Sequence, residues 1–298
     1  MAGKRASRGG GYAVYLIPGV VASLAIIVVP MVMTVYTSFT KWNGVGDQTW
    51  IGFDNYTRLF HDELFWQSFS HIILLILAMA VVPTLLGLVL AAVLFDYVAK
   101  HFSSRWASLF RSGFYLPQVI PVAVTGIVWG WILHPEYGAL NKILDSIGLS
   151  GLAKNWLGDE NYALYSVMFI MIWFQLGYPI VMFMSGLQRI DPSLYEAADL
   201  DGAGLWSKIW HVTIPQTRLV LSMMLLLQIV ATMQEFTNVF LMAGGNGPEN
   251  STMTVVYMVY QYAFSYNNFG SAAALGLFLL LVLAAFSGVY ARLSRNSD

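Results

Sequence analysis

The sequence lacks cysteine and has few charged residues. Only 10% of its 298 residues are Asp, Glu, Lys or Arg, whereas a soluble domain carries about 25%. The absence of cysteine excludes disulfide scaffolds, thiolate metal sites and cysteine nucleophiles. A formal net charge of −1 provides no basic surface for nucleic acid. Because 57% of the residues are hydrophobic, the composition indicates an integral membrane protein.

Long stretches without charge locate the membrane crossings. A helix needs about 20 mostly apolar residues to cross a bilayer, and five charge-free stretches are long enough. A sixth stretch is interrupted only by Glu235. The crossings are expected within residues 12–40, 64–95, 112–135, 161–188, 219–242 and 270–292. The sequence therefore predicts an all-α membrane protein with six transmembrane helices.

The first stretch follows Lys4, Arg5 and Arg8, as the apolar region of a secretory signal would. A cleavable signal has an apolar region of only about 7–15 residues, followed by small residues at the cleavage site. This stretch is far longer and ends in residues 36–40, Tyr-Thr-Ser-Phe-Thr. We therefore expect an uncleaved first helix.

Basic residues predict the orientation of these helices. Six crossings place both termini on one side of the membrane. With the termini inside, the inner segments hold 11 Lys and Arg residues and the outer segments hold 4. Because Lys and Arg favour the cytoplasmic side, both termini are expected in the cytoplasm.

The chain divides into four expected parts. These are a cytoplasmic tail (1–11), a first helix with an outer interfacial segment (12–66), a permeation core (67–292) and a second tail (293–298). The interfacial segment is rich in aromatic residues, which favour the headgroup region. Between the third and fourth crossings, residues 140–147 are expected to form a short outer helix.

An inner loop, residues 189–218, carries more structure than a simple turn. Asp191 is suited to cap a helix that has Pro192 at its first position. Leu194, Ala197 and Ala198 then share one helical face, and the two acidic residues of the same helix are expected to point elsewhere.

The same loop contains signals for a turn and a second helix. Gly202 and Gly204 both permit the positive φ with which a chain leaves a helix. A second short helix is expected over residues 205–212, and Pro215 suits the first turn of the next membrane helix.

The loop resembles a known motif. Residues 196–203 read Glu-Ala-Ala-Asp-Leu-Asp-Gly-Ala, and an Ile-Pro pair follows at 214–215. This pattern is similar to the EAA loop of binding-protein-dependent ABC importer permeases. Segments at 42–44, 52–60, 250–252 and 269–270 are similar to carbohydrate-type members, such as maltose, oligosaccharide and glycerol-phosphate permeases. The resemblance implies that a separate ATPase is coupled through Glu196, Ala197, Ala198, Asp201, Gly202, Ala203, Ile214 and Pro215.

The resemblance also implies the assembly. In type I ABC importers of this kind, a second and usually non-identical permease completes the path through the lipid bilayer. Two nucleotide-binding subunits hold ATP and Mg²⁺, and an external solute-binding protein delivers the sugar. This chain would need no cofactor and would not itself be an enzyme. Such importers lie in bacterial or archaeal cytoplasmic membranes.

Polar residues in the fifth crossing suggest a substrate path. Glu235 is the one acidic residue expected within a crossing, and intramembrane carboxylates usually face a cavity or a partner. On a continuous helix, Gln228, Glu235 and Asn238 share one stripe, with Gln234 beside it. This stripe suits sugar hydroxyls, but Glu235 near the headgroups and Gln228 bonded to another helix explain it equally well.

Further path candidates are Trp129, Gln175 and Tyr178, which could stack on a sugar or hydrogen-bond to it. Aromatic residues near helix ends are more often interface anchors, so that interpretation comes first for each. The five histidines are scattered and show no metal-ligand spacing.

Two other classes of membrane protein are alternatives. A proton- or ion-coupled secondary transporter using Glu235 fits the charge pattern but leaves the inner loop unexplained. A six-helix intramembrane serine protease requires a Gly-x-Ser-Gly serine and a histidine on the last helix. Met184 precedes Ser185-Gly186 in place of that motif, and the last crossing has no histidine, so the sequence argues strongly against this function.

Overall fold

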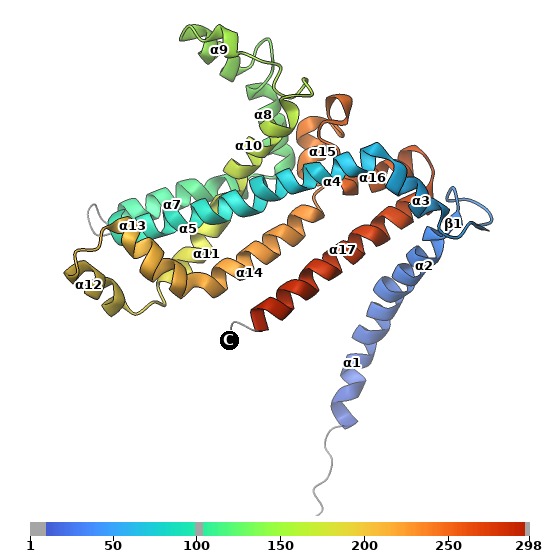
Figure 1. The fold of residues 1–298 in the computed structure, drawn as a ribbon, viewed down its shortest axis with the longest axis horizontal. Coiled ribbons are helices and arrows are strands. Elements are labelled where there is room, and N and C mark those ends of the chain that lie inside the picture. Colours follow the sequence, from blue (N-terminus) through green and yellow to red (C-terminus); the bar gives the residue numbers. More distant parts are fainter. Residues whose placement is uncertain (1–9, 99–103, 296–298) are drawn as a thin grey trace, which may run out of the picture. The chain divides into compact units, whose positions relative to one another are not determined.

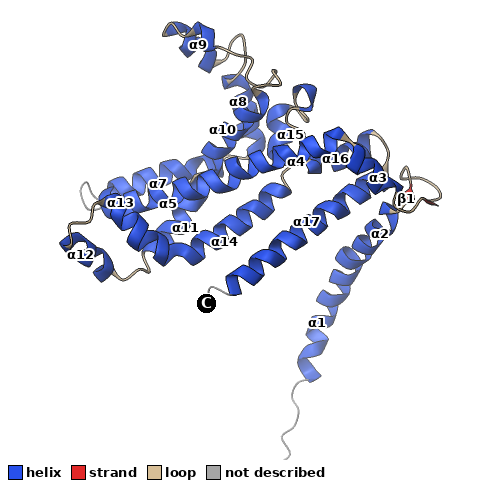
Figure 2. Ribbon diagram, viewed as in Figure 1, coloured by secondary structure: helices blue, strands red, loops and turns tan. Residues whose placement is uncertain are grey.

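The computed structural model describes residues 10–98 and 104–295 as helices joined by loops and one small hairpin (Figures 1 and 2). The chain separates into two compact units. The first contains the residues up to Asp62 together with Val259–Val282, and the second contains Glu63–Met258 and the residues from Leu283 onward.

The first unit contains one long amino-terminal helix and the elements that follow it. Its elements are α1 (Gly10–Ser23), the π-helical turn η1 (Leu24–Val28), α2 (Val29–Ser38), β1 (Thr40–Lys41), β2 (Thr49–Trp50), α3 (Asp54–His61), η7 (Gln261–Ser265) and the first part of α17 (Phe269–Arg295). Residues Tyr15–Ser38 form a 24-residue apolar helix. None of its most apolar 18-residue window is buried, as expected for a helix that meets lipid or another subunit.

The side chain of Asn55 connects three elements of the first unit by hydrogen bonds. It is only 2% exposed, and its Nδ2 donates to the carbonyls of Ser38 and Thr40, both at 2.9 Å. Its Oδ1 accepts a hydrogen bond from Ser271 Oγ at 3.2 Å. One buried amide therefore joins the end of α2, the hairpin and the start of α17.

The second unit contains the other long helices. Its elements are α4 (Glu63–Ile76), η2 (Leu77–Val81), α5 (Val82–Ala92), η3 (Val93–Val98), α7 (Ser104–Val119), α8 (Val122–Ile132), α9 (Ala139–Ser146), η4 (Ser150–Leu152), α10 (Ala163–Gln175), α11 (Gly177–Leu187), α12 (Pro192–Leu200), α13 (Leu205–Lys208), η5 (Ile209–Thr213), α14 (Ile214–Met233), α15 (Thr237–Ala243) and η6 (Pro248–Asn250). The residues of a further helix, α16 (Val255–Tyr260), are divided between the units: those up to Met258 belong to the second unit, and the last two belong to the first.

Proline explains three of the π-helical turns. Pro30, Pro83 and Pro215 each stand at the second position of a helical segment, and η1, η2 and η5 directly precede those segments. A proline ring has no N–H and clashes with the carbonyl one turn earlier. Widening that turn to the π pattern relieves the clash while the helix continues. The helices Glu63–Val98 and Leu205–Met233 thus run through their prolines without a break.

The core of the second unit is built where α5 and α11 pack together. Leu88, Ile180, Phe183 and Leu187 are almost fully buried in one cluster. Gly87 permits the close approach, because a Cβ added there would lie 2.5 Å from the Cβ of Pro179. A second cluster joins α4 and η2 with α10 and α15.

Most of the predicted crossings correspond to long apolar helices. Among the described residues, five helices are long and apolar enough to cross a membrane: Tyr15–Ser38, Glu63–Val98, Ala163–Leu187, Leu205–Met233 and Phe269–Arg292. The short helix predicted at 140–147 is also found, as α9.

Two predicted crossings need correction. Residues 112–135 do not form one straight helix, because α7 and α8 meet at a bend of 97° before Pro121, which has extended ψ. The helix expected over 219–242 already begins at Leu205 and ends at Met233, and α15 follows as a separate short helix.

Candidate functional site

The loop between α11 and α14 begins with a capped helix. Asp191 accepts a hydrogen bond from the Ser193 backbone N–H at 2.9 Å, and Pro192 takes the first helical position, as predicted. The bonds from the Ser193 backbone and side chain lower the pKa of the Asp191 carboxyl. The cap therefore carries a negative charge at neutral pH and stabilises the positive end of α12.

Gly202 ends α12. Its φ is +73°, and the Ala203 N–H donates to the Ala198 carbonyl at 2.9 Å, which closes the helix end. The expectation that Gly204 also takes a positive φ is wrong: its φ is −70°, and it stands just before α13. One left-handed residue is enough to end α12, so the chain is already extended when it reaches Gly204.

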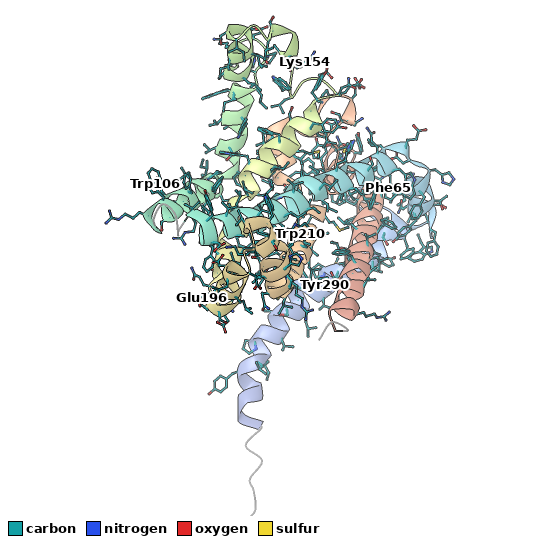
Figure 3. All side chains as sticks on the ribbon, turned by 60° about the vertical axis from the view of Figure 1, so that its left-hand side comes forward. Phe65, Trp106, Lys154, Glu196, Trp210 and Tyr290 are labelled. Atoms are coloured by element: carbon teal, nitrogen blue, oxygen red, sulfur yellow. The ribbon has the colours of Figure 1, made fainter. Side chains whose placement is uncertain are left out.

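The two faces of α12 differ in their surroundings. Tyr195 and Asp199, one turn apart, face the rest of the unit, and Tyr195 is only 7% exposed. Glu196 and Ala197 are exposed, and the Glu196 side chain points away from the ribbon (Figure 3). Leu200 is 90% exposed, an unusual position for a large apolar side chain. The helix therefore has a bound face and a free face.

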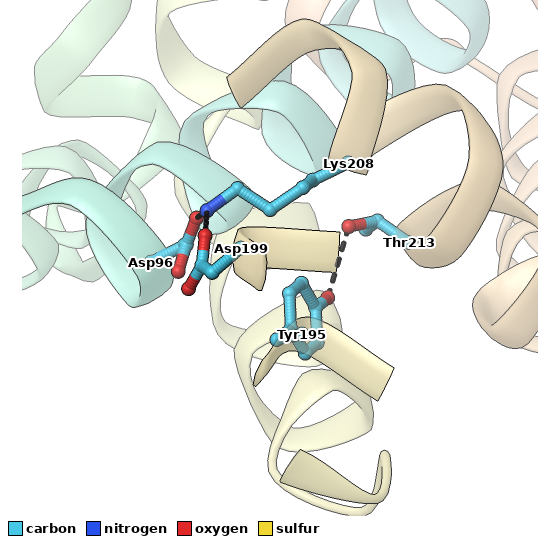
Figure 4. A network of polar contacts seen from close by, with 5 residues as sticks. All are labelled: Asp96, Tyr195, Asp199, Lys208 and Thr213. Atoms are coloured by element: carbon cyan, nitrogen blue, oxygen red, sulfur yellow. Dashed lines mark hydrogen bonds and ion pairs between the residues drawn. The ribbon is translucent and has the colours of Figure 1, made fainter. Parts of the chain in front are cut away.

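A polar network holds the bound face (Figure 4). Lys208 Nζ lies 2.7 Å from Asp199 Oδ1 and 2.5 Å from Asp96 Oδ2. The hydroxyls of Tyr195 and Thr213 are 2.9 Å apart. The network thus includes Asp199, whose carboxylate is held by a lysine of α13.

Sequence reasoning missed four members of this network: Asp96, Tyr195, Lys208 and Thr213. A usable signal was present, since Tyr195 and Asp199 are four residues apart and share a helical face. Asp96 is also the first charged residue after the second crossing. Only the structure shows that Lys208 reaches both carboxylates.

The remaining motif residues lie along the same loop. Asp201 and Gly202 are exposed, and Ala198 and Ala203 are half-buried. Ile214 is half-buried and Pro215 is exposed at the start of α14. The second short helix expected at 205–212 is found, but it continues through η5 into α14 without a turn.

The structure separates the candidates of the predicted substrate stripe. Because α14 ends at Met233, Gln228, Glu235 and Asn238 do not lie on one continuous helix. Glu235 Oε1 instead accepts the Asn238 backbone N–H at 2.7 Å, near the start of α15. Thr254 Oγ1 donates to the Glu235 carbonyl at 3.3 Å, which holds the chain at this break. Gln234 is exposed, and its side chain bonds back to the Val230 carbonyl.

Two polar atoms near this break have no hydrogen-bond partner within the described part of the chain. They are Gln228 Nε2 and Asn238 Oδ1, and both are buried. A buried polar group without a hydrogen-bond partner costs free energy, and a bound ligand or water would offset that cost.

Two of the other path candidates, Gln175 and Tyr178, lie on either side of Leu176, where α10 ends and α11 begins, and the third, Trp129, lies within α8. Gln118 Nε2, at the end of α7, donates to Gln175 Oε1 at 3.1 Å, at the end of α10. Tyr178, just after the start of α11, packs against the cluster of α5 and α11. Trp129 packs edge-to-face on Trp173, with ring centroids 5.5 Å apart, which favours a packing role.

Residues 84–297 match the family described as the binding-protein-dependent transport system inner membrane component. This match covers more than half of the chain, so the chain belongs to that family of ABC transporter permeases, as the inner loop indicates. Several of its relatives are sugar permeases.

Individual relatives agree with this assignment. The chain is 33% identical over 274 residues to the probable ABC transporter permease YurN of Bacillus subtilis, covering 92% of each chain. It is 31% identical to the sulfoquinovosyl glycerol permease SmoG of Agrobacterium fabrum, covering 95% of this chain and 90% of the relative.

A solved structure shares the fold. This is a bacterial alginate ABC transporter in complex with a periplasmic protein that holds an alginate pentasaccharide. The TM-score is 0.77 at 19% identity, covering 95% of this chain and 93% of the other. None of these relatives favours the ion-coupled carrier that Glu235 suggested.

Proposed function

We propose that this chain is a permease subunit of an ATP-driven sugar importer and that α12 is the helix that meets the ATPase. The observation that carries the proposal is the free face of α12. Glu196, Ala197 and Leu200 are exposed on a helix whose opposite face is fixed to the unit. Small residues beside an exposed leucine suit a helix that enters a groove of a partner protein.

The family description supports a binding protein as a further partner. The proposed assembly contains this chain, a second permease, two ATPase subunits that hold ATP and Mg²⁺, and an external binding protein. Sugar specificity for oligosaccharides or sugar derivatives is proposed from the names of the relatives. The assembly belongs in a bacterial or archaeal cytoplasmic membrane.

The proposed topology has six crossings and both termini in the cytoplasm. It counts the bent pair α7–α8 as one crossing. Under this topology, α9 and α12 lie on opposite sides of the membrane, because α9 precedes the span Ala163–Leu187 and α12 follows it. The excess of Lys and Arg places α12 inside, where an ATPase is found.

The proposed mechanism uses two states of the permease pair. Closure of the ATPase subunits on ATP moves α12, and this movement opens the path outward to the binding protein. The ATPase and the binding protein then bias the same two-state equilibrium from opposite sides of the membrane.

The proposed sugar path passes the helix breaks. Two membrane segments of the second unit are broken, at Pro121 and at residues 234–236, and a third, Ala163–Leu187, departs from a regular α-helix at Leu176. The short helix α15 packs against α8 and α10, so all three segments meet there. Interrupted membrane helices expose backbone and side-chain polar groups to a substrate.

The free polar atoms of Gln228 and Asn238 are proposed to bond sugar hydroxyls. Gln228→Leu or Asn238→Leu should lower sugar uptake in whole cells at least tenfold, with a normal amount of assembled transporter. Gln67→Leu, on the exposed surface of α4, is the control. Uptake that stays at the wild-type level in both path variants would remove these residues from the path.

A pull-down of the tagged chain from native membranes tests the main proposal. Gly202→Asp places a branched, charged residue at a left-handed position on α12, where nothing lies within 4 Å. Gly148→Asp is the matched control, because Gly148 also has a positive φ, +80°, and open space, but follows α9.

Wild type and Gly148→Asp should bring down an ATPase and a second permease. Gly202→Asp should keep the second permease and lose the ATPase. If wild type brings down no ATPase under gentle conditions, the coupling role of α12 is wrong.

A further inference from the structure

Lys208 joins three elements of the second unit at one point (Figure 4). Its ammonium contacts Asp199 in α12 and Asp96 in η3, and Lys208 itself ends α13. The side chains of Lys208 and Asp96 are 10% and 7% exposed, whereas that of Asp199 is 46% exposed. The Lys208–Asp96 pair is therefore shielded from water, and the Asp199 side extends toward the loop surface.

A second contact holds α12 one turn away. Tyr195 bonds the buried Thr213 of η5 at 2.9 Å, and its ring lies 6.1 Å from the ring of Phe95 in η3. Two side chains four residues apart thus attach α12 to the helix Leu205–Met233, Asp199 through Lys208 and Tyr195 through Thr213. Attachment at two points along a helix axis resists rotation as well as separation.

Of the three charged residues in this network, Lys208 is the one whose removal should disturb the network most, for electrostatic reasons. Two carboxylates that share one site repel each other, and a cation between them offsets that repulsion. The interaction is strengthened where water is excluded, and it is hydrogen-bonded as well as charged. Removing the ammonium alone leaves the two acidic groups facing one another, whereas removing Asp199 leaves the shielded Lys208–Asp96 pair.

Both membrane helices reached by this network are long and unbroken. Asp96 lies in η3 at the inner end of the 36-residue helix Glu63–Val98. Lys208 and Thr213 lie near the start of the 29-residue helix Leu205–Met233. Because these residues belong to the two long helices, a movement of α12 that displaces them also displaces both helices of the membrane core.

We propose that Lys208 is a positioning residue whose bonds to Asp96 and Asp199 make α12 move as one rigid body with these two helices. The proposal rests on the proposed coupling role of α12. In it, the ATPase does not bend a flexible loop. The movement of α12 is instead transmitted to the core without being lost at the junction.

A distance measurement within the chain tests this directly. Because the sequence has no cysteine, Leu200→Cys and Leu86→Cys place spin labels at two defined sites, in α12 and in α5. Both leucines are exposed. Pulsed electron paramagnetic resonance then gives the distribution of distances between them in the purified transporter, with and without MgATP.

The wild-type network should give one narrow distribution that MgATP does not broaden. Lys208→Met, which has a similar length and no charge, should give a distribution about twofold wider. Lys208→Arg should stay close to wild type. A role limited to folding would lower the yield of Lys208→Met but leave its distribution narrow, and that result would overturn the proposal.

A charge swap covers the case in which Lys208→Met does not fold. Asp96→Lys combined with Lys208→Asp keeps one cation and two carboxylates at this point, with the cation now supplied by η3. The swapped chain should regain both its yield and a narrow distribution. If it behaves like Lys208→Met, the proposal is wrong. Since the distance lies within one chain, this result does not depend on whether an ATPase co-purifies.

Discussion

At the scale of single residues, buried polar side chains position the termini of helices. Asn55 does so for the first unit, where its amide satisfies two backbone carbonyls and one hydroxyl. Buried carbonyls that lose a donor pay the cost of leaving water without a replacement. The stability of this region therefore depends on one amide.

Replacing that amide should destabilise the protein. Asn55→Leu keeps the approximate size but removes the donor, and it should cost about 1–3 kcal/mol of unfolding free energy. This loss of stability lowers the melting temperature, which is the temperature at which half of the purified chain is no longer monodisperse. Asn43→Leu, at an exposed position of the hairpin loop, should leave that temperature unchanged. Equal melting temperatures for Asn55→Leu and wild type would contradict the assignment.

Asp191 should make the stability of α12 depend on pH. Its pKa is lowered in the folded protein, so its contribution is present at neutral pH and lost as the pH falls through that lowered pKa. At neutral pH, Asp191→Ala should exchange its α12 amide hydrogens several-fold faster than wild type. Asp191→Asn keeps an acceptor oxygen, so its exchange rate should lie between those of wild type and Asp191→Ala.

Hydrogen exchange followed by mass spectrometry measures this, with each pH referenced to an unfolded peptide. The difference between wild type and Asp191→Asn should disappear in acid. Identical exchange of α12 in all three proteins at neutral pH would show that the cap does not stabilise the helix.

At the scale of elements, the sequence predicts where helices lie better than where they break. Charge-free stretches locate the spans because a bilayer excludes charge. Residues 230–238 contain neither proline nor glycine, so the local sequence has no signal for the end of α14. That break is held by distant contacts, such as the bond from Thr254 to the Glu235 carbonyl. The inner loop was predictable because its cap, its turn glycine and its motif are all local, whereas the Lys208 network is not.

The close approach of α5 and α11 provides a test at this scale. Gly87→Ala adds a methyl group where a Cβ would lie 2.5 Å from Pro179, so the helices must separate. Overpacking of this kind costs about 1–3 kcal/mol, and the melting temperature should fall. Gly276→Ala, in α17, meets no atom within 4 Å and is the control. A melting temperature that falls equally in both variants would point to a general effect of losing glycine.

At the scale of the whole molecule, the family match and the proposed mechanism involve the same part of the chain. The family match covers residues 84–297, which include α12 and the breaks near α15. The polar network, the free face of α12 and the free polar atoms near α15 all lie in the second unit. This unit therefore contains both the proposed contact with the ATPase and the proposed sugar path.

The most direct test of the central claim asks what the free face of α12 touches. Leu200→Cys provides a single reactive thiol on that face, and Ile147→Cys, 62% exposed just after α9, provides the control. Both chains are expressed with the complete transporter and treated in native membranes with a thiol-to-amine cross-linker.

The account predicts that Leu200→Cys is joined to the ATPase subunit and that Ile147→Cys is not. An impermeant maleimide added to intact spheroplasts should label only Ile147→Cys. If Leu200→Cys is labelled from outside, or is joined to no ATPase while the transporter remains intact, α12 is not the helix that couples ATP to transport.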